Sequence, residues 1–186
     1  MGFLDTLKSE IKVFVPQNKQ KTRTNYTTPS GRFIKSLKTQ IKYIDMIEED
    51  DLEHKGFDYI IEKLKENIEE HNKGVDANLK VEIIKPIKGK RNLWFKKEEN
   101  KKGDLVYITL TKIGVKWYNI MPDVLVGEDG EPLPGDKAAF EGTENIESIK
   151  KIYQSLIKAA RNNELDGIFE EFEKEQTAAK SNTEKA

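Results

Sequence analysis

Basic and aromatic residues alternate along residues 80–118, and no other part of the sequence combines residue types so well suited to binding a ligand. This block holds eleven Lys and Arg against four Asp and Glu, together with both tryptophans of the chain. Lysine and arginine contact the phosphates of a single-stranded nucleic acid, and flat aromatic rings stack on its bases. The residues predicted to form a nucleic-acid-binding surface are Lys90, Arg91, Trp94, Lys96, Lys97, Lys101, Lys102, Tyr107 and Trp117.

The aromatic residues of this block have a second interpretation, as part of the core. Neighbouring side chains of a strand point to opposite faces, so Trp94 and Phe95 cannot both face the same layer, and the same holds for Trp117 and Tyr118. If helices cover one face of the sheet and the N-terminal segment covers the other, every ring is buried. Aromatic residues at strand spacing are more often core than ligand platforms, and both interpretations stay open.

Catalytic and metal-binding patterns are missing from the sequence. It contains no phosphate-binding glycine loop, nucleophile elbow or zinc-protease motif, and no cysteine. His54 and His71 would lie about 25 Å apart on one predicted helix, too far to share a metal ion. The acidic loop at 122–142 lacks the ligand spacing of a calcium-binding EF-hand. We therefore expect no enzymatic activity, no metal site and no cofactor.

The formal net charge of −1 conceals four blocks of alternating sign. Residues 1–44, 45–79, 80–118 and 119–186 carry net charges of +7, −8, +7 and −7. Opposite blocks could cover one another in the fold, or a basic block could face a polyanion while an acidic block restrains it or contacts a protein. A nucleic-acid hypothesis must therefore rest on residues 80–118 and on the basic residues at 17–44.

Length and composition limit the class of protein. The chain has 186 residues, of which 35% are charged and 36% hydrophobic, which is enough for one domain with a small core. No apolar stretch approaches the ~20 residues that a membrane span requires. Charges interrupt the apolar positions of residues 1–15, so we expect no signal peptide, no contact with a membrane and a cytoplasmic location, which would be the host cytoplasm for a viral protein.

The N-terminal part of the chain is predicted to be helical, with one interruption. Residues 1–16 have the apolar spacing of a short amphipathic helix that ends at Pro16, and residues 17–31 read as a flexible basic arm. Thr28 and Pro29 are typical of a helix start. Two amphipathic stripes then predict a helical hairpin over residues 32–73, with an antiparallel arrangement of its helices.

From residue 79 the period changes from helical to alternating. Residues 79–120 predict an antiparallel meander of three or four strands, and residues 122–142 a long acidic loop. C-terminal helices are predicted over 144–176 and a disordered tail over 177–186. The expected fold is thus α+β, with a single domain over 32–176 in which the meander packs against the helical hairpin and the C-terminal helices.

One stretch of the sequence resembles a known kind of protein. A basic turn with an aromatic strand at 88–95 is followed by a hairpin ending at 112–116 and later by a helix that runs into Asn163-Glu164-Leu165-Asp166. Over roughly residues 80–176 this looks like a family of small uncharacterised bacterial and phage proteins, in which a Gly-Glu-Leu-Asp-like turn ends the helix. The chain departs from that pattern by placing Asn163 where glycine is usual. The resemblance implies a fold and a bacterial or phage origin, without an activity.

Two functional hypotheses follow. The first is a small accessory protein that binds nucleic acid, preferably single-stranded, through the basic aromatic sheet. The alternative is a protein–protein interaction module, either an inhibitor of a host or defence enzyme or a structural virion component, that uses the acidic surfaces. The sequence does not fix the oligomeric state.

Overall fold

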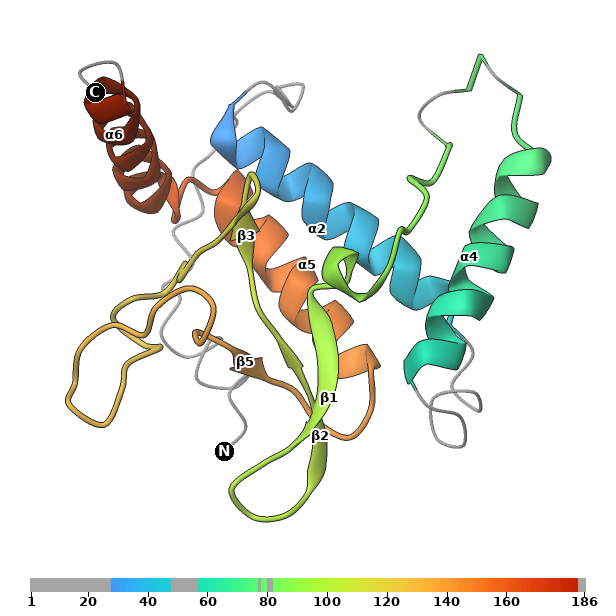
Figure 1. The fold of residues 1–186 in the computed structure, drawn as a ribbon, viewed down its shortest axis with the longest axis horizontal. Helices are drawn as coiled ribbons and strands as arrows, with labels where there is room; N and C mark the ends of the chain where they lie inside the picture. The colour runs from blue at the N-terminus through green and yellow to red at the C-terminus, as the bar shows by residue number, and fades with distance from the viewer. Residues whose placement is uncertain (1–27, 48–56, 77, 80–81, 184–186) are drawn as a thin grey trace.

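The computed structural model describes residues 28–47, 57–76, 78–79 and 82–183 (Figure 1). The helix predicted over residues 1–16 and nearly all of the arm predicted over 17–31 lie outside the described residues. The helices are α2 (Pro29–Asp45), α4 (Phe57–Lys73), the 3₁₀ helix η1 (Lys90–Asn92), α5 (Glu147–Arg161) and α6 (Asp166–Thr183). The strands are β1 (Phe95–Glu99), β2 (Leu105–Thr109), β3 (Lys112–Ile113), β4 (Lys116–Trp117) and β5 (Phe140–Glu141). The predicted α+β class is confirmed.

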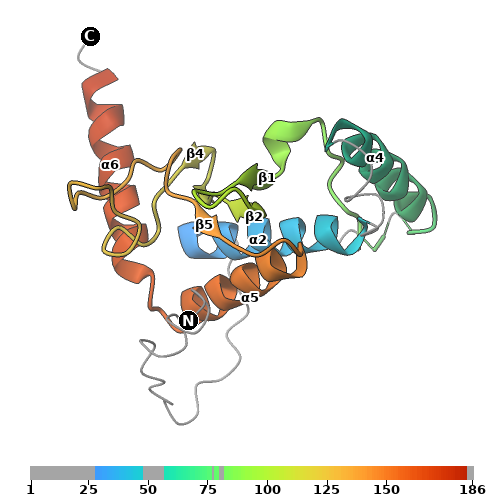
Figure 2. The ribbon, with the colours of Figure 1, turned by 90° about the horizontal axis from the view of Figure 1, so that it is seen from below.

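Helix α2 is the central element of the fold. The Thr28 hydroxyl accepts a hydrogen bond from the Gly31 N–H at 3.1 Å, and Pro29 occupies the first helical position, as the sequence predicted. One face of α2 packs against α5, and the N-terminal part also contacts α6 and β3. Figure 2 shows α2 between α5 and the strands. Phe33 and Leu37 are almost fully buried in this layer.

The main sheet has three antiparallel strands in the order β1-β2-β5. Its β1–β2 hairpin runs in register from Phe95 opposite Thr109 to Glu99 opposite Leu105. The third strand is β5, whereas the run at 115–118 contributes to a separate two-stranded hairpin, β3–β4. A strand of two residues at the end of a long loop has no period that sequence patterns can detect, although its Phe140 is fully buried.

Helix α4 meets the end of α2 and then diverges from it (Figures 1 and 2). The Asn67 side chain donates a hydrogen bond to the carbonyl oxygen of Met46, just past the last residue of α2. The apolar stripe of α4, which includes Leu64 and Ile68, is buried as predicted. The pair is therefore helical as expected, but its members are not side by side along their length.

The two C-terminal helices are joined by a tight turn at Asn163. This residue has φ of +65°, and it is the only non-glycine residue in the described ranges with a positive φ. The Glu164 N–H bonds back to the carbonyl oxygen of Ala159 at 3.1 Å, which closes the end of α5. Asparagine is one of the few residues that tolerate this conformation, and so it can stand where the resemblance would place glycine.

Helix α6 extends further than the sequence indicated. The tail expected to be disordered from residue 177 is helical through Thr183. Glu, Lys, Gln and Ala are favourable helix formers, and the Thr177 hydroxyl donates to the carbonyl oxygen of Glu173 at 2.9 Å. A polar composition indicated disorder, but helix propensity sustains a solvated extension of a helix that Phe169 and Phe172 fix to the core.

Candidate nucleic-acid interface

The segment between α4 and β1 is held in place by side chains of the helices rather than by a ladder of strand hydrogen bonds. The Asn72 side chain of α4 donates to the Ile84 carbonyl oxygen and accepts from the Ile84 N–H, both at 2.9 Å. In the same way the Gln40 side chain of α2 donates to the Asn92 carbonyl oxygen at 2.8 Å and accepts from the Trp94 N–H at 3.0 Å. Both ends of residues 84–94 are therefore fixed by a primary amide.

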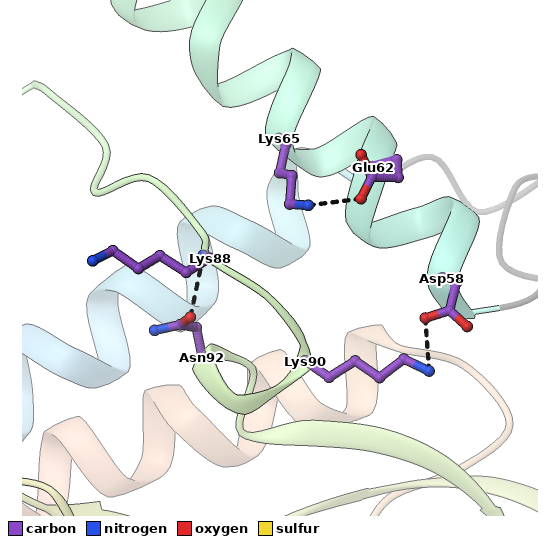
Figure 3. Close-up of polar contacts among 6 residues, drawn as sticks. All are labelled: Asp58, Glu62, Lys65, Lys88, Lys90 and Asn92. Atoms are coloured by element: carbon purple, nitrogen blue, oxygen red, sulfur yellow. Dashed lines mark hydrogen bonds and ion pairs between the residues drawn. The ribbon is translucent and has the colours of Figure 1, made fainter.

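Between these two points the segment is held by further contacts. The Tyr43 hydroxyl donates to the carbonyl oxygen of Lys85 at 2.9 Å, and burial raises the pKa of Tyr43, which keeps it a neutral donor. The Asn92 side chain accepts from the Lys88 N–H at 3.2 Å (Figure 3). Ile87 is buried. A connection without strands thus has a defined backbone.

This backbone turns apolar side chains inward and cations outward. Ile84 and Ile87 are both 4% exposed. Residues 85–91, which we call the cationic segment, present a set of exposed basic side chains on the opposite side. These are Lys85, Lys88, Lys90 and Arg91.

The charges of the cationic segment are only partly neutralised. Lys90 Nζ lies 2.7 Å from a carboxylate oxygen of Asp58 at the start of α4 (Figure 3). Lys85, Lys88 and Arg91 form no ion pair with any residue that the structure describes. An exposed ion pair is worth at most about 1 kcal/mol, so Lys90 can also exchange its partner for a phosphate.

The other predicted cations lie along the β1–β2 hairpin and are not gathered with Lys90 and Arg91. Lys96 is paired with Glu98, whereas Lys97 lies over the Tyr107 ring at 5.5 Å from its centroid. Lys101 and Lys102 lie in the hairpin turn beyond the far end of β1, a strand about 17 Å long that separates them from η1. The hairpin therefore separates the predicted cations into two groups.

Two of the three predicted stacking rings are in the core. Trp94 is 7% exposed and stacks on Phe33, with ring centroids 6.3 Å apart. Tyr107 is 2% exposed. A ring enclosed on both faces has no surface for a base, so of the two interpretations left open by the sequence the structure places these two rings in the core.

Trp117 is half-buried, and a lysine occupies part of its surface. Lys112 Nζ lies 3.9 Å from the centroid of the Trp117 ring and donates to the carbonyl oxygen of Arg91 at 3.1 Å. Burial lowers the pKa of Lys112. These contacts join the β3–β4 hairpin to the end of the cationic segment, so the two form one continuous surface.

The sequence prediction included Lys90, Arg91 and Trp117 of this surface but missed the other residues that build it. Lys85 and Lys88 belong to the basic block but were not among the predicted site residues, and Gln40 and Asn72 were not considered. Gln40 carries a usable signal, because it occupies an apolar stripe position between Leu37 and Ile44 on α2. A polar residue in such a stripe is buried only with hydrogen-bond partners.

Comparisons of this chain with protein-family models, with curated proteins and with solved structures gave no match. Within the described ranges no helix is long and apolar enough to cross a membrane. The same ranges hold no group of three or more His, Asp or Glu residues placed to hold a metal ion.

Proposed function

We propose that this protein binds nucleic acid, and that the cationic segment contacts the phosphate backbone. The observation that carries the proposal is the combination of exposed basic side chains with a backbone fixed from α2 and α4. Lys88 and Arg91 are exposed and form no ion pair with the described residues. Exposed Lys and Arg supply most of the affinity of non-specific nucleic-acid binding, because phosphate contacts release condensed counterions.

A fixed backbone strengthens the case for this segment. Ordering a flexible basic loop on a ligand costs conformational entropy, and that cost is smaller where the loop is already ordered. Gln40 and Asn72 hold both ends of the segment before any ligand arrives. Because Trp94 and Tyr107 are buried, the proposal no longer relies on base stacking by these rings and takes phosphate contact as the main interaction.

A salt titration with matched charge reversals tests the proposal. Fluorescent single- and double-stranded oligonucleotides are titrated with wild type and with a Lys88→Glu/Arg91→Glu variant at about 50 and about 200 mM salt. The variant should bind more weakly, and its slope of log affinity against log salt should be smaller by roughly two.

The control is a Lys151→Glu/Lys158→Glu variant, which makes the same charge change at exposed positions of α5. Figure 2 places α5 on the other side of α2 from the strands. The control should retain most of the affinity. Absence of wild-type binding at about 50 mM salt, or an equal loss in the control, contradicts the proposal.

A contact with another protein through α6 is the second candidate function. The observation that favours it is that residues 173–179 are exposed without exception, so this part of α6 projects from the body of the fold (Figures 1 and 2). A pull-down from the native cell with wild type and a Glu173→Lys variant tests it. Recovery of a protein that the variant does not retain supports this function, and identical recovery contradicts it.

A further inference from the structure

We propose that Val115, at the tip of the β3–β4 hairpin, inserts as an apolar wedge between base pairs of a duplex when the cationic segment is bound to its phosphates. This inference rests on the proposed function and specifies the nucleic acid as double-stranded. Val115 is 96% exposed, the highest value among the exposed large hydrophobic residues of the described ranges.

The hairpin turn is unusual in its composition. Lys112 pairs with Trp117 and Ile113 with Lys116, which leaves Gly114 and Val115 as a two-residue loop. Gly114 has φ of +64° and Val115 has no positive φ, which is the pattern of a type II′ turn. Such turn positions favour small polar residues that interact with water. Val115 is β-branched and apolar, so it cannot form these hydrogen bonds with water and instead exposes an aliphatic side chain to solvent.

The hairpin is packed against α6 behind its tip. The Lys116 ammonium lies 2.9 Å from a carboxylate oxygen of Glu175 on α6. The Tyr118 ring contacts Phe172 edge to face, with centroids 5.4 Å apart. Val115 therefore lies at the tip of a hairpin that is packed on α6, and an inserted side chain needs a packed support of this kind to unstack bases.

Position and charge connect this tip with the cationic segment. Lys112, three residues before Val115, donates through Nζ to the carbonyl oxygen of Arg91. A duplex whose phosphates contact Arg91 thus passes beside the hairpin. Proteins that insert an aliphatic side chain between base steps combine it with flanking basic residues in this way, and the insertion kinks the duplex.

An anionic lipid surface is the other partner that an apolar tip among cations could meet, and the structure favours it less. Burial of one valine contributes only about 1.5 kcal/mol, which is too little to hold a protein at a bilayer. A single side chain is sufficient for a wedge between two base pairs.

The experiment uses the full chain and a short duplex that carries a fluorescent adenine analogue, whose emission rises when it unstacks. Wild type should raise the emission, and Val115→Ser should not. The affinity of Val115→Ser for the duplex should be roughly tenfold lower than that of wild type, as expected for the burial of one valine. Because serine suits the turn, the variant should remain folded. Val126→Ser, at a 40% exposed valine of the acidic loop, is the matched control and should behave as wild type.

The possible outcomes separate this inference from the proposed function. If wild type and Val115→Ser both bind the duplex equally and neither raises the emission, the wedge is refuted while backbone binding stands. If neither binds any oligonucleotide, both proposals fail. Binding to vesicles of equal parts phosphatidylcholine and phosphatidylserine that requires Val115, without unstacking of the duplex, also overturns the wedge.

Discussion

The Gln40 side chain accepts a hydrogen bond from the backbone N–H of Trp94 at 3.0 Å, although the two residues are 54 positions apart in the sequence. The same amide donates to the carbonyl oxygen of Asn92. Gln40 is 4% exposed, so neither of these backbone groups can replace it readily with water. One side chain thus fixes the entry of the chain into β1.

Replacement of Gln40 by leucine should therefore destabilise the fold. Gln40→Leu keeps a similar volume but leaves the buried Trp94 N–H without a partner, at about 1–3 kcal/mol, and the part-buried Asn92 carbonyl oxygen also loses its donor. Urea unfolding followed by circular dichroism measures the difference. Gln154→Leu, the same change at an exposed position of α5, should stay within about 0.5 kcal/mol of wild type. A similar loss in both variants would contradict a specific role of Gln40.

The hydroxyl groups of Thr109 and Tyr153 should contribute unequally to the free energy of unfolding. Their oxygens are 2.7 Å apart, and the Thr109 hydroxyl also lies 3.1 Å from the carbonyl oxygen of Trp94. Thr109→Val leaves the buried Tyr153 hydroxyl without a partner and should cost about 1–3 kcal/mol, whereas Tyr153→Phe should cost about 1 kcal/mol because Thr109 keeps its second acceptor.

Chemical denaturation of both single variants and of the double variant tests this order. The double variant should be more stable than the sum of the single losses indicates, since neither hydroxyl is then stranded. Equal losses in the single variants and full additivity would show that the hydroxyl contact contributes nothing beyond packing.

Glycine at position 163 should stabilise the junction of α5 and α6. Asn163 has φ of +65°, which glycine adopts without the steric cost that a side chain brings. Asn163→Gly should raise the free energy of unfolding by up to about 1 kcal/mol, and Asn163→Ala should lower it. The neighbouring Asn162 has φ of −86°, so Asn162→Gly should not stabilise. Thermal unfolding of the three variants shows whether the gain is specific to position 163.

Ionisation of Tyr118 should reduce stability at high pH. Burial, together with Glu175 and Glu171, raises the pKa of Tyr118 to about 12 from its ordinary value of 10. Between these values the unfolded chain has lost the proton that the folded chain keeps, so the free energy of unfolding falls as pH rises from about 10 to about 12.

Two variants isolate this contribution. Tyr118→Phe should remove its part of the pH dependence. Glu175→Gln should lower the Tyr118 pKa, because burial and an acceptor for the hydroxyl remain but the negative charge of Glu175 is lost. Absorbance titration of tyrosinate, with Tyr118→Phe as the reference, measures the pKa. An unchanged titration curve in Glu175→Gln would rule out the contribution of Glu175.

Sequence patterns predicted those elements of the fold that repeat a local rule. The cap and first turn of α2 follow from Thr28 and Pro29, and the β1–β2 hairpin follows from alternating residues around a turn at Gly103, whose φ is +87°. The pairing of β2 with β5 is different, because Ile108 and Glu141 are brought together across a long loop. Strand β5 has only two residues, which is too short for an alternating pattern from which its pairing could be predicted.

In the candidate site, too, local features were predictable from the sequence and long-range contacts were not. Basic residues at 85–102 were visible as a charge block, but charge alone does not say which side chains share a surface. Their grouping depends on Gln40, 52 positions from Asn92, and on Asn72, 12 positions from Ile84, and a charge pattern records neither contact. The aromatic residues were equally ambiguous, since a ring that stacks on a base and a ring that fills a core satisfy the same strand pattern.

Side chains of Gln40, Tyr43, Asn72, Asn92 and Lys112 form hydrogen bonds with the backbone of residues 84–94, and none of these bonds comes from a lysine or arginine side chain within the segment. Charge on this segment and the conformation of its backbone are therefore governed by different positions. Substitution of exposed basic residues here, apart from Lys90 with its ion pair to Asp58, should therefore change the charge of the surface with little effect on the fold. The same independence means that the charge of this surface can be changed one side chain at a time while its backbone stays the same.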